Sequence, residues 1–146
     1  MIANGASDYL VAAKALRSNP LNAPHPYWFC VFQSIELSFK AYLRGKGFSK
    51  EDLKSAKLGH RLRALYELAK SHDLKDVVAL TCDEEIIVCD AGEMYSKKVF
   101  QYTEAAWKSL PYAYQAYAVA EKLLTAIRPF AERQRTLHHE KPTAVQ

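Results

Sequence analysis

The chain of 146 residues has few glycines and few cysteines, and each shortage argues against a class of site. Its five glycines are dispersed, so there is no glycine-rich loop of the kind that holds a phosphate group. The three cysteines, Cys30, Cys82 and Cys89, have none of the spacings of a zinc knuckle. An odd number of scattered cysteines indicates reduced, buried thiols, which are typical of a cytoplasmic protein.

Long hydrophobic runs are missing as well. No apolar run is long enough to span a bilayer, and residues 1–7 have neither the basic region nor the apolar core of a signal peptide. The sequence therefore predicts no membrane contact and a cytoplasmic location. Charge of one sign does not dominate, since the net charge of +4 permits a polyanionic partner without requiring one.

Motifs for metal binding and for covalent catalysis are sparse. The sequence has no H-x-x-x-H pair and no E-x-x-H pair of the kind that forms a metal site in a helical bundle. No serine or cysteine lies in a recognisable nucleophile motif. We therefore expect neither a metal nor a cofactor.

Apolar residues at helical spacing are abundant. They recur every three or four residues, which is the period of one face of an α-helix. The pattern predicts helices over residues 7–18, 27–44, 60–71 and 82–98, a last helix from about residue 109, and a short helical turn over 50–57. Ser49 and Thr81 each begin a sequence typical of a capping box, and Ser7 is a candidate cap for the first helix.

Prolines and glycines mark the predicted ends of these helices. The segment from Leu21 to Pro26 is expected to be a stiff connector, and Gly45-Lys46-Gly47 a helix stop. Pro129 is expected to kink or end the last helix near Ala126. We predict an all-α fold, an antiparallel up-and-down bundle of four to five helices over residues 1–132, followed by a polar tail over 133–146 whose far end is disordered.

Two short motifs lie in the second and third predicted helices. Residues 36–41 have the form E-L-x-x-K-A, and residues 59–65 have the form G-H-x-L-x-x-L. In form and order they resemble the motifs of the HEPN family, and residues 93–102 are similar to the Y-x-x-x-R-Y close of some members. The resemblance implies an all-helical homodimer that binds a nucleotide or RNA. It also implies a nucleotidyltransferase as a protein partner, in a toxin–antitoxin or defence pair.

Many HEPN proteins are metal-independent ribonucleases with an R-x(4–6)-H motif on the fourth helix. At that place this chain has Lys97 and Lys98 but no histidine. A literal match, from Arg133 to His138, lies in the predicted tail, and we interpret it as coincidence. The sequence therefore favours a noncatalytic binding module. The alternatives are a ribonuclease that uses Arg133 and His138 across a dimer, and a structural dimeric adaptor.

Six residues form the predicted ligand site: Glu36, Lys40, His60, Lys97, Lys98 and Tyr102. Glu36 and Lys40 are one turn apart, so they form either a surface ion pair or the polar edge of a groove. His60 either bonds to a neighbouring helix, with Glu36 as one candidate partner, or carries protons near neutral pH. Lys97 and Lys98 either complement a helix end or contribute, with Lys40, Arg61, Arg63 and Tyr102, to a basic phosphate site.

Overall fold

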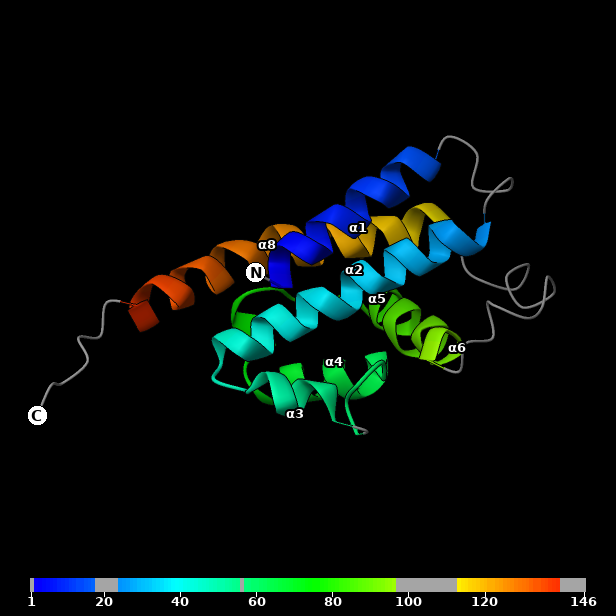
Figure 1. The fold of residues 1–146 in the computed structure, drawn as a ribbon. Coiled ribbons are helices and arrows are strands. Elements are labelled where there is room, and N and C mark those ends of the chain that lie inside the picture. The colour runs from blue at the N-terminus through cyan, green and yellow to red at the C-terminus, as the bar shows by residue number, and fades with distance from the viewer. Residues whose placement is uncertain (1, 18–23, 56, 97–112, 140–146) are drawn as a thin grey trace, which may run out of the picture.

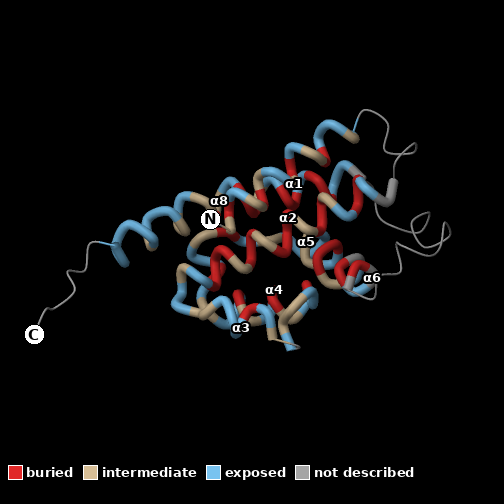
Figure 2. The backbone as a smooth tube through the Cα atoms, in the orientation of Figure 1, coloured by how far each residue is buried: buried red, intermediate tan, exposed pale blue. Residues whose placement is uncertain are grey.

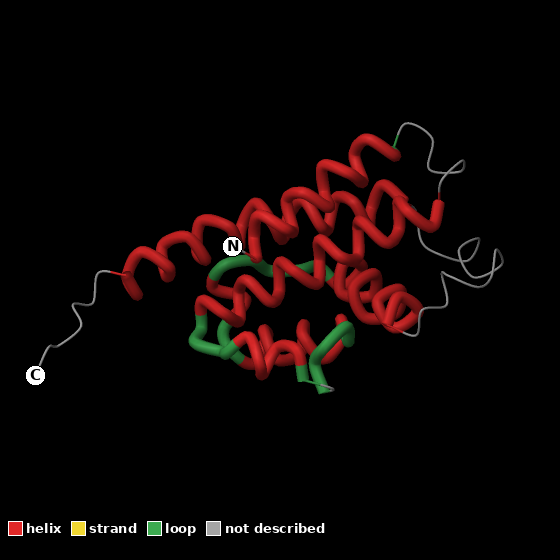
Figure 3. The backbone as a smooth tube through the Cα atoms, in the orientation of Figure 1, coloured by secondary structure: helices red, strands yellow, loops and turns green. Residues whose placement is uncertain are grey.

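The computed structural model describes residues 2–17, 24–55, 57–96 and 113–139, and every regular element within them is helical (Figures 1 and 3). The all-α prediction is confirmed for this part of the chain. The elements are α1 (Ile2–Leu16), α2 (Pro24–Gly45), α3 (Lys50–Lys54), α4 (Leu62–Ser71), the 3₁₀ turn η1 (Leu74–Asp76), α5 (Cys82–Ile86), the π-helical turn η2 (Ile87–Ala91), α6 (Gly92–Ser96) and α8 (Ala113–His139).

Helix α2 is the centre of the bundle, and both α1 and α8 pack along it (Figure 1). The Ser34 hydroxyl on α2 donates to the Ala6 carbonyl on α1 at 2.8 Å. Arg17, which follows α1, lies 4.9 Å from the ring of Tyr117 near the start of α8. The C-terminal ends of α2 and α8 lie together at the opposite end of the bundle. Helix α1 therefore runs antiparallel to the other two, whereas α2 and α8 run in the same direction.

A second group of short helices, α4 and the continuous run α5–η2–α6, packs against another side of α2 (Figure 1). Phe39 on α2 contacts Tyr66 on α4, with ring centroids 5.6 Å apart. A Cβ atom added to Gly92 would lie 2.9 Å from Leu62 Cβ, so α6 and α4 approach at a point where a larger residue does not fit. This close approach brings α6 toward the middle of α2.

The apolar stripes that predicted the helices face a common interior (Figure 2). One residue from each of four stripes, Ile35, Leu65, Ile87 and Leu123, is at most 4% exposed. The apolar stripe of residues 82–98 includes Ile86, Ile87 and Ala91 and predicts that Ile86 is buried; Ile86 is 52% exposed, so this prediction is wrong. Its neighbours Ile87 and Val88 occupy the buried face, and successive helical positions lie about 100° apart around the axis.

Several predicted helix ends are confirmed by local hydrogen bonds. Gly47 has the left-handed φ of 102°, and the Phe48 N–H donates to the Leu43 carbonyl at 3.1 Å, the pattern of a Schellman stop. Ser49 and Thr81 both form complete capping boxes. These ends depend on residues close in sequence.

Other predicted ends are wrong. Helix α1 begins at Ile2, so Ser7 lies inside it and is not its cap. Helix α2 begins at Pro24, because proline in a first helical turn gives up an N–H that has no partner there in any case. Helix α4 begins at Leu62, so His60 lies in the preceding turn.

Pro129 does not end the last helix, and α8 continues to His139. The predicted polar tail is therefore helical over 133–139, and α8 crosses the expected boundary at residue 132. The physical reason is packing beyond the proline: the Phe130 ring lies 5.0 Å from the Tyr42 ring, and the Lys46 ammonium lies 5.6 Å from the same Phe130 ring. These contacts with the end of α2 offset the hydrogen bond that Pro129 removes.

Candidate functional site

The predicted pair Glu36 and Lys40 lies in a buried polar cluster. The Glu36 side chain is 1% exposed and that of Lys40 is 13% exposed. The Lys40 ammonium donates to Glu36 Oε1 at 2.7 Å. The surface interpretation of this pair is therefore wrong, because a carboxylate buried to this degree requires charged or hydrogen-bonding partners to offset its lost hydration.

His60 and Tyr95 supply the other partners of Glu36. The imidazole Nδ1 of His60 lies 3.2 Å from both carboxylate oxygens, so of the alternatives left open for this residue the structure shows the contact with Glu36. The Tyr95 hydroxyl donates to Glu36 Oε2 at 3.1 Å and also contacts the Gln33 side chain. We call these five residues the Glu36 cluster. It links α2 to α6 and to the turn before α4.

Tyr95 was not among the predicted site residues. Burial, followed by the nearby Glu36 carboxylate, raises the pKa of its phenol, so the hydroxyl stays protonated and acts as a donor. Its ring stacks on Phe32 with centroids 5.7 Å apart. A lone tyrosine 59 residues from Glu36 has no spacing signal that would have indicated this contact.

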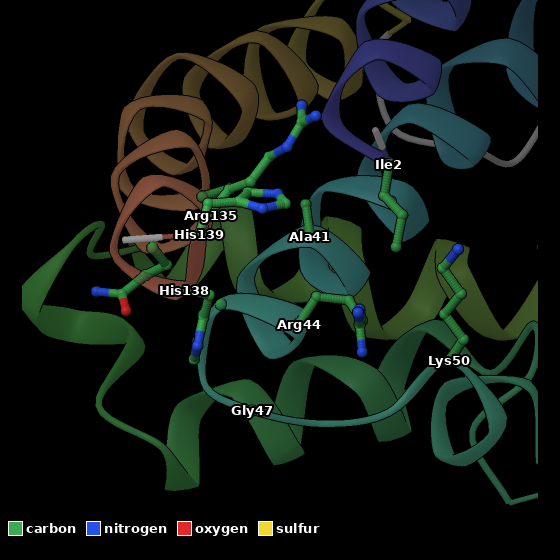
Figure 4. Close-up of a pocket in the computed structure, with 11 residues that line it drawn as sticks. Ile2, Ala41, Arg44, Gly47, Lys50, Arg135, His138 and His139 are labelled. Carbon is green, nitrogen blue, oxygen red and sulfur yellow. The ribbon is translucent and has the colours of Figure 1, made fainter. Parts of the chain in front are cut away.

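A pocket of about 530 Å³ lies at the end of the bundle where α1 begins and α2 and α8 end (Figure 4). None of the Glu36 cluster lines it. Its lining comes from the first residue of α1, the C-terminal turns of α2, the turn into α3 and the last turns of α8. The lining residues are Ile2, Ala41, Arg44, Gly45, Gly47, Lys50, Ala131, Gln134, Arg135, His138 and His139.

Basic side chains dominate this lining. They are Arg44, Lys50, Arg135, His138 and His139, and the described lining residues include no acid. The Arg44 guanidinium donates to the Phe48 carbonyl at 2.7 Å, which holds it across the turn after α2. Figure 4 shows basic side chains reaching the hollow from three different segments. We call this the basic pocket. Arg44, Lys50 and Arg135 are cations at neutral pH, and clustered cations produce a positive potential that attracts anions.

Two glycines shape the basic pocket. Gly47 provides the left-handed residue that turns the chain from α2 toward α3. Gly45 lies where α8 approaches α2, and a Cβ atom added there would lie 2.6 Å from Phe130 Cε1. The predicted stop sequence therefore also forms part of the site, a role that its helix-ending pattern did not indicate.

The structure separates the two residues of the literal R-x(4)-H match. His138 lines the basic pocket, whereas Arg133 does not. The reason is the helix period, since residues five apart lie about 140° apart around the axis. Arg135 and His139 are four apart, about 40° around the axis, and both line the pocket. The R-x(4)-H match thus includes one residue of the basic pocket, His138, but its arginine, Arg133, lies outside the pocket, which is lined by Arg135 instead.

The remaining predicted site residues lie elsewhere. Lys97, Lys98 and Tyr102 lie outside the described residues. Arg63 is one of the residues predicted to contribute to a basic phosphate site. It approaches Glu93 at 3.5 Å on the surface, so its charge is partly balanced.

The sequence analysis did not predict four residues of the basic pocket, which are Arg44, Lys50, Arg135 and His139. Arg135 and His139 are four residues apart, so they share a face only if this segment is helical. The sequence could therefore have indicated them only if the last helix had been predicted to continue past Pro129.

The three cysteines are free thiols. Burial raises the pKa of the Cys30 and Cys89 thiols, which lowers the fraction of reactive thiolate. Cys82 is exposed, contrary to the expectation of buried thiols. Among the described residues, no group of three or more histidine, cysteine or acidic side chains is placed to hold a metal ion.

Comparison of the chain with protein-family models, curated proteins and solved structures finds no match. None of the helices in the described ranges has both the length and the apolar character needed to cross a membrane.

Proposed function

We propose that this protein is a noncatalytic, HEPN-like module that binds a nucleotide or RNA through its phosphate groups in the basic pocket. The observation that carries the proposal is the lining itself, which combines five basic side chains with no acid among the described residues. Arginine and lysine are the usual contacts of phosphate oxygens. The volume of about 530 Å³ lies within the ordinary range of small-molecule sites.

The HEPN-like part of the proposal rests on the two short motifs. Their polar residues Glu36, Lys40 and His60 meet in one cluster, which gives the motifs a shared structural role. By the same resemblance, the protein forms a homodimer in the cytoplasm and pairs with a nucleotidyltransferase in a toxin–antitoxin or defence system. Light scattering coupled to gel filtration tests the dimer directly.

The noncatalytic part is supported by the separation of Arg133 from the basic pocket. A metal-independent ribonuclease needs a histidine for proton transfer and a cation for the phosphate at one place. The predicted pair Arg133 and His138 does not meet that requirement within one chain, since Arg133 is absent from the pocket lining. The basic pocket does combine His138 and His139 with Arg44 and Arg135, so a ribonuclease that uses these residues is the second candidate function.

The test is a gel-shift and cleavage assay with labelled RNA in the presence of a chelator. We expect a shift without cleavage, and about tenfold weaker binding when the salt concentration is raised from 50 to 200 mM, because phosphate contacts release counterions. Arg135→Gln should weaken the shift, whereas Arg133→Gln, on the same helix but outside the pocket, should change it little.

Two results would count against the proposal. Cleavage that disappears in His138→Ala or His139→Ala would favour the ribonuclease. Absence of any shift, together with no nucleotide-induced rise in melting temperature of a stable dimer, would favour the structural adaptor.

A further inference from the structure

We propose that the basic pocket recognises linked phosphate groups, as in a triphosphate or a short polyphosphate, and does not recognise the nucleobase. The inference rests on the proposed function and narrows it. It concerns which part of a ligand the pocket contacts. Three observations support it: the hydrogen-bonding groups of the lining, the distribution of the basic side chains, and the lack of phenylalanine, tyrosine and tryptophan among the described lining residues.

Three of the lining side chains, those of Arg44, Lys50 and Arg135, are donors only, because arginine and lysine carry N–H groups and no acceptor. The only side-chain oxygen among the described lining residues belongs to Gln134, and a neutral His138 or His139 ring has one acceptor nitrogen. The edge of a nucleobase presents both donors and acceptors, so its recognition requires acceptors on the protein. Phosphate oxygens only accept when the group is ionised. The three cationic side chains of the lining therefore complement phosphate oxygens, and none of the three can accept a hydrogen bond from a base edge.

The basic side chains are spread around the basic pocket. Figure 4 shows Arg135 and His139 on one side and Lys50 on the other, with Arg44 between them. They come from α8, α3 and α2. A single phosphate placed against one wall contacts the side chains of that wall alone. A ligand with several adjacent phosphates reaches both walls, and each contact is a charge-assisted hydrogen bond.

No phenylalanine, tyrosine or tryptophan is among the described lining residues. Proteins that bind unpaired bases usually stack them on such rings. The Phe130 ring lies close to Gly45, but it packs against Tyr42 at 5.0 Å between their centroids and so belongs to the contact between α2 and α8. A base that follows the phosphates out of the pocket therefore meets no large ring among the described residues of the wall.

Isothermal titration calorimetry of the full chain tests this inference with five ligands: inorganic tripolyphosphate, ATP, UTP, adenosine and orthophosphate. We expect tripolyphosphate, ATP and UTP to bind within about threefold of one another, since their shared phosphates supply the affinity. Adenosine and orthophosphate should bind at least about tenfold more weakly, because each lacks the linked phosphates.

Matched variants locate the binding. Arg135→Gln and Arg44→Gln should each weaken tripolyphosphate binding about five- to tenfold. Arg133→Gln and Lys54→Gln remove the same charge from α8 and α3 outside the basic pocket, and should change the affinity less than about twofold. If Arg44→Gln alters the circular dichroism spectrum, the exposed Lys50→Gln replaces it.

The outcomes separate the two proposals. A difference between ATP and UTP greater than about tenfold, with tripolyphosphate not binding, overturns the inference and leaves the proposed function intact. Tripolyphosphate binding without any nucleotide or RNA binding supports the inference and overturns the proposed function. Equal weakening by Arg133→Gln and Arg135→Gln shows attraction to the whole basic surface and overturns recognition by this pocket.

Discussion

At the residue scale, the most consequential feature is the burial of Glu36. Its carboxylate is removed from water, and its partners come from the same helix, from the turn before α4 and from α6. Removing one member of a buried ion pair leaves the other charge buried and unpaired. The resulting loss of folding stability is larger than the stability that the intact pair contributes. The cluster therefore stabilises the arrangement of these three segments more than an exposed pair at the same spacing does.

We predict that Glu36→Gln lowers the free energy of unfolding by about 2–4 kcal/mol, because it leaves the nearly buried Lys40 without a counter-charge. The matched control is Glu132→Gln, which removes the exposed pair of Arg128 and Glu132 at the same four-residue spacing. That change should cost less than about 0.5 kcal/mol. Urea denaturation at neutral pH measures both, and equal costs would contradict a structural role for the cluster.

A second residue-scale prediction concerns Glu84. Burial alone would raise the pKa of its carboxyl, but hydrogen bonds from Lys122 at 2.7 Å and from the Thr81 N–H at 2.8 Å outweigh it and lower the pKa below the ordinary 4.5. A carboxyl with a lowered folded pKa stabilises the protein above its ordinary pKa, and this contribution is lost as the pH falls through the folded value.

The stability difference between the wild type and Glu84→Gln should therefore be constant from about pH 8 to pH 6 and should shrink below about pH 4.5. Thermal unfolding across this range measures it. Glu67→Gln, on the exposed surface of α4, is the control for the general effect of removing one negative charge. A difference that grows on acidification would reverse the assigned sign.

At the element scale, α8 shows how packing overrides a local signal. Pro129 removes a backbone hydrogen bond, and its ring crowds the preceding turn. The helix nevertheless continues for ten residues to His139, and Ala131 and Gln134 lie in the wall of the basic pocket. The contact of Phe130 with Tyr42 anchors the segment beyond the proline. Local propensity predicts where a helix is weak, but not whether a neighbour stabilises it.

Pro129→Ala should therefore stabilise the protein by about 1–3 kcal/mol, because alanine restores the missing N–H and favours helix. Pro129 is exposed, so no packing is lost. The control Thr125→Ala, one turn earlier at an exposed position, lacks the backbone effect and should change stability much less. Destabilisation by Pro129→Ala would indicate that α8 requires the proline geometry to reach α2.

At the scale of the whole molecule, the basic pocket exists because segments far apart in the chain meet at one end of the bundle. Residue 2, residues 41–50 and residues 131–139 contribute to it. The close approach of α8 to Gly45 sets the distance between two of these segments. A change at this crossing should therefore affect ligand binding even though it removes no charge.

We predict that Gly45→Ala destabilises the protein by about 1–3 kcal/mol and weakens tripolyphosphate binding, because the added Cβ displaces Phe130 and the end of α8. Gly5→Ala is the control, since its Cβ would meet a terminal methyl of Leu37 at 3.2 Å, away from the basic pocket. Denaturation and calorimetry measure the two effects. Unchanged binding in a destabilised Gly45→Ala would show that the crossing does not set the pocket geometry.

The sequence by itself determined which segments are helical and, apart from Ile86, which of the apolar residues discussed above face the interior. Stripes such as the one through Phe32, Ile35 and Phe39 identify helices because the 3.6-residue period is a property of the backbone. The caps at Ser49 and Thr81 and the stop at Gly47 were equally predictable, since their hydrogen bonds join residues within one turn. The contact of His60 with Glu36 was one of the alternatives that the sequence left open, and the structure selected it.

Only the tertiary structure decided which polar residues share a site. Tyr95 contacts Glu36 because α6 packs on α4 at Gly92. Arg135 lines the basic pocket because the contact of Phe130 with Tyr42 stabilises the part of α8 that follows Pro129. These contacts depend on how helices cross, which is set by the sizes of side chains at a few points between distant segments. The apolar period along one helix shows which face of that helix is buried, whereas the basic pocket is lined by residues from several helices, whose relative positions the period does not give.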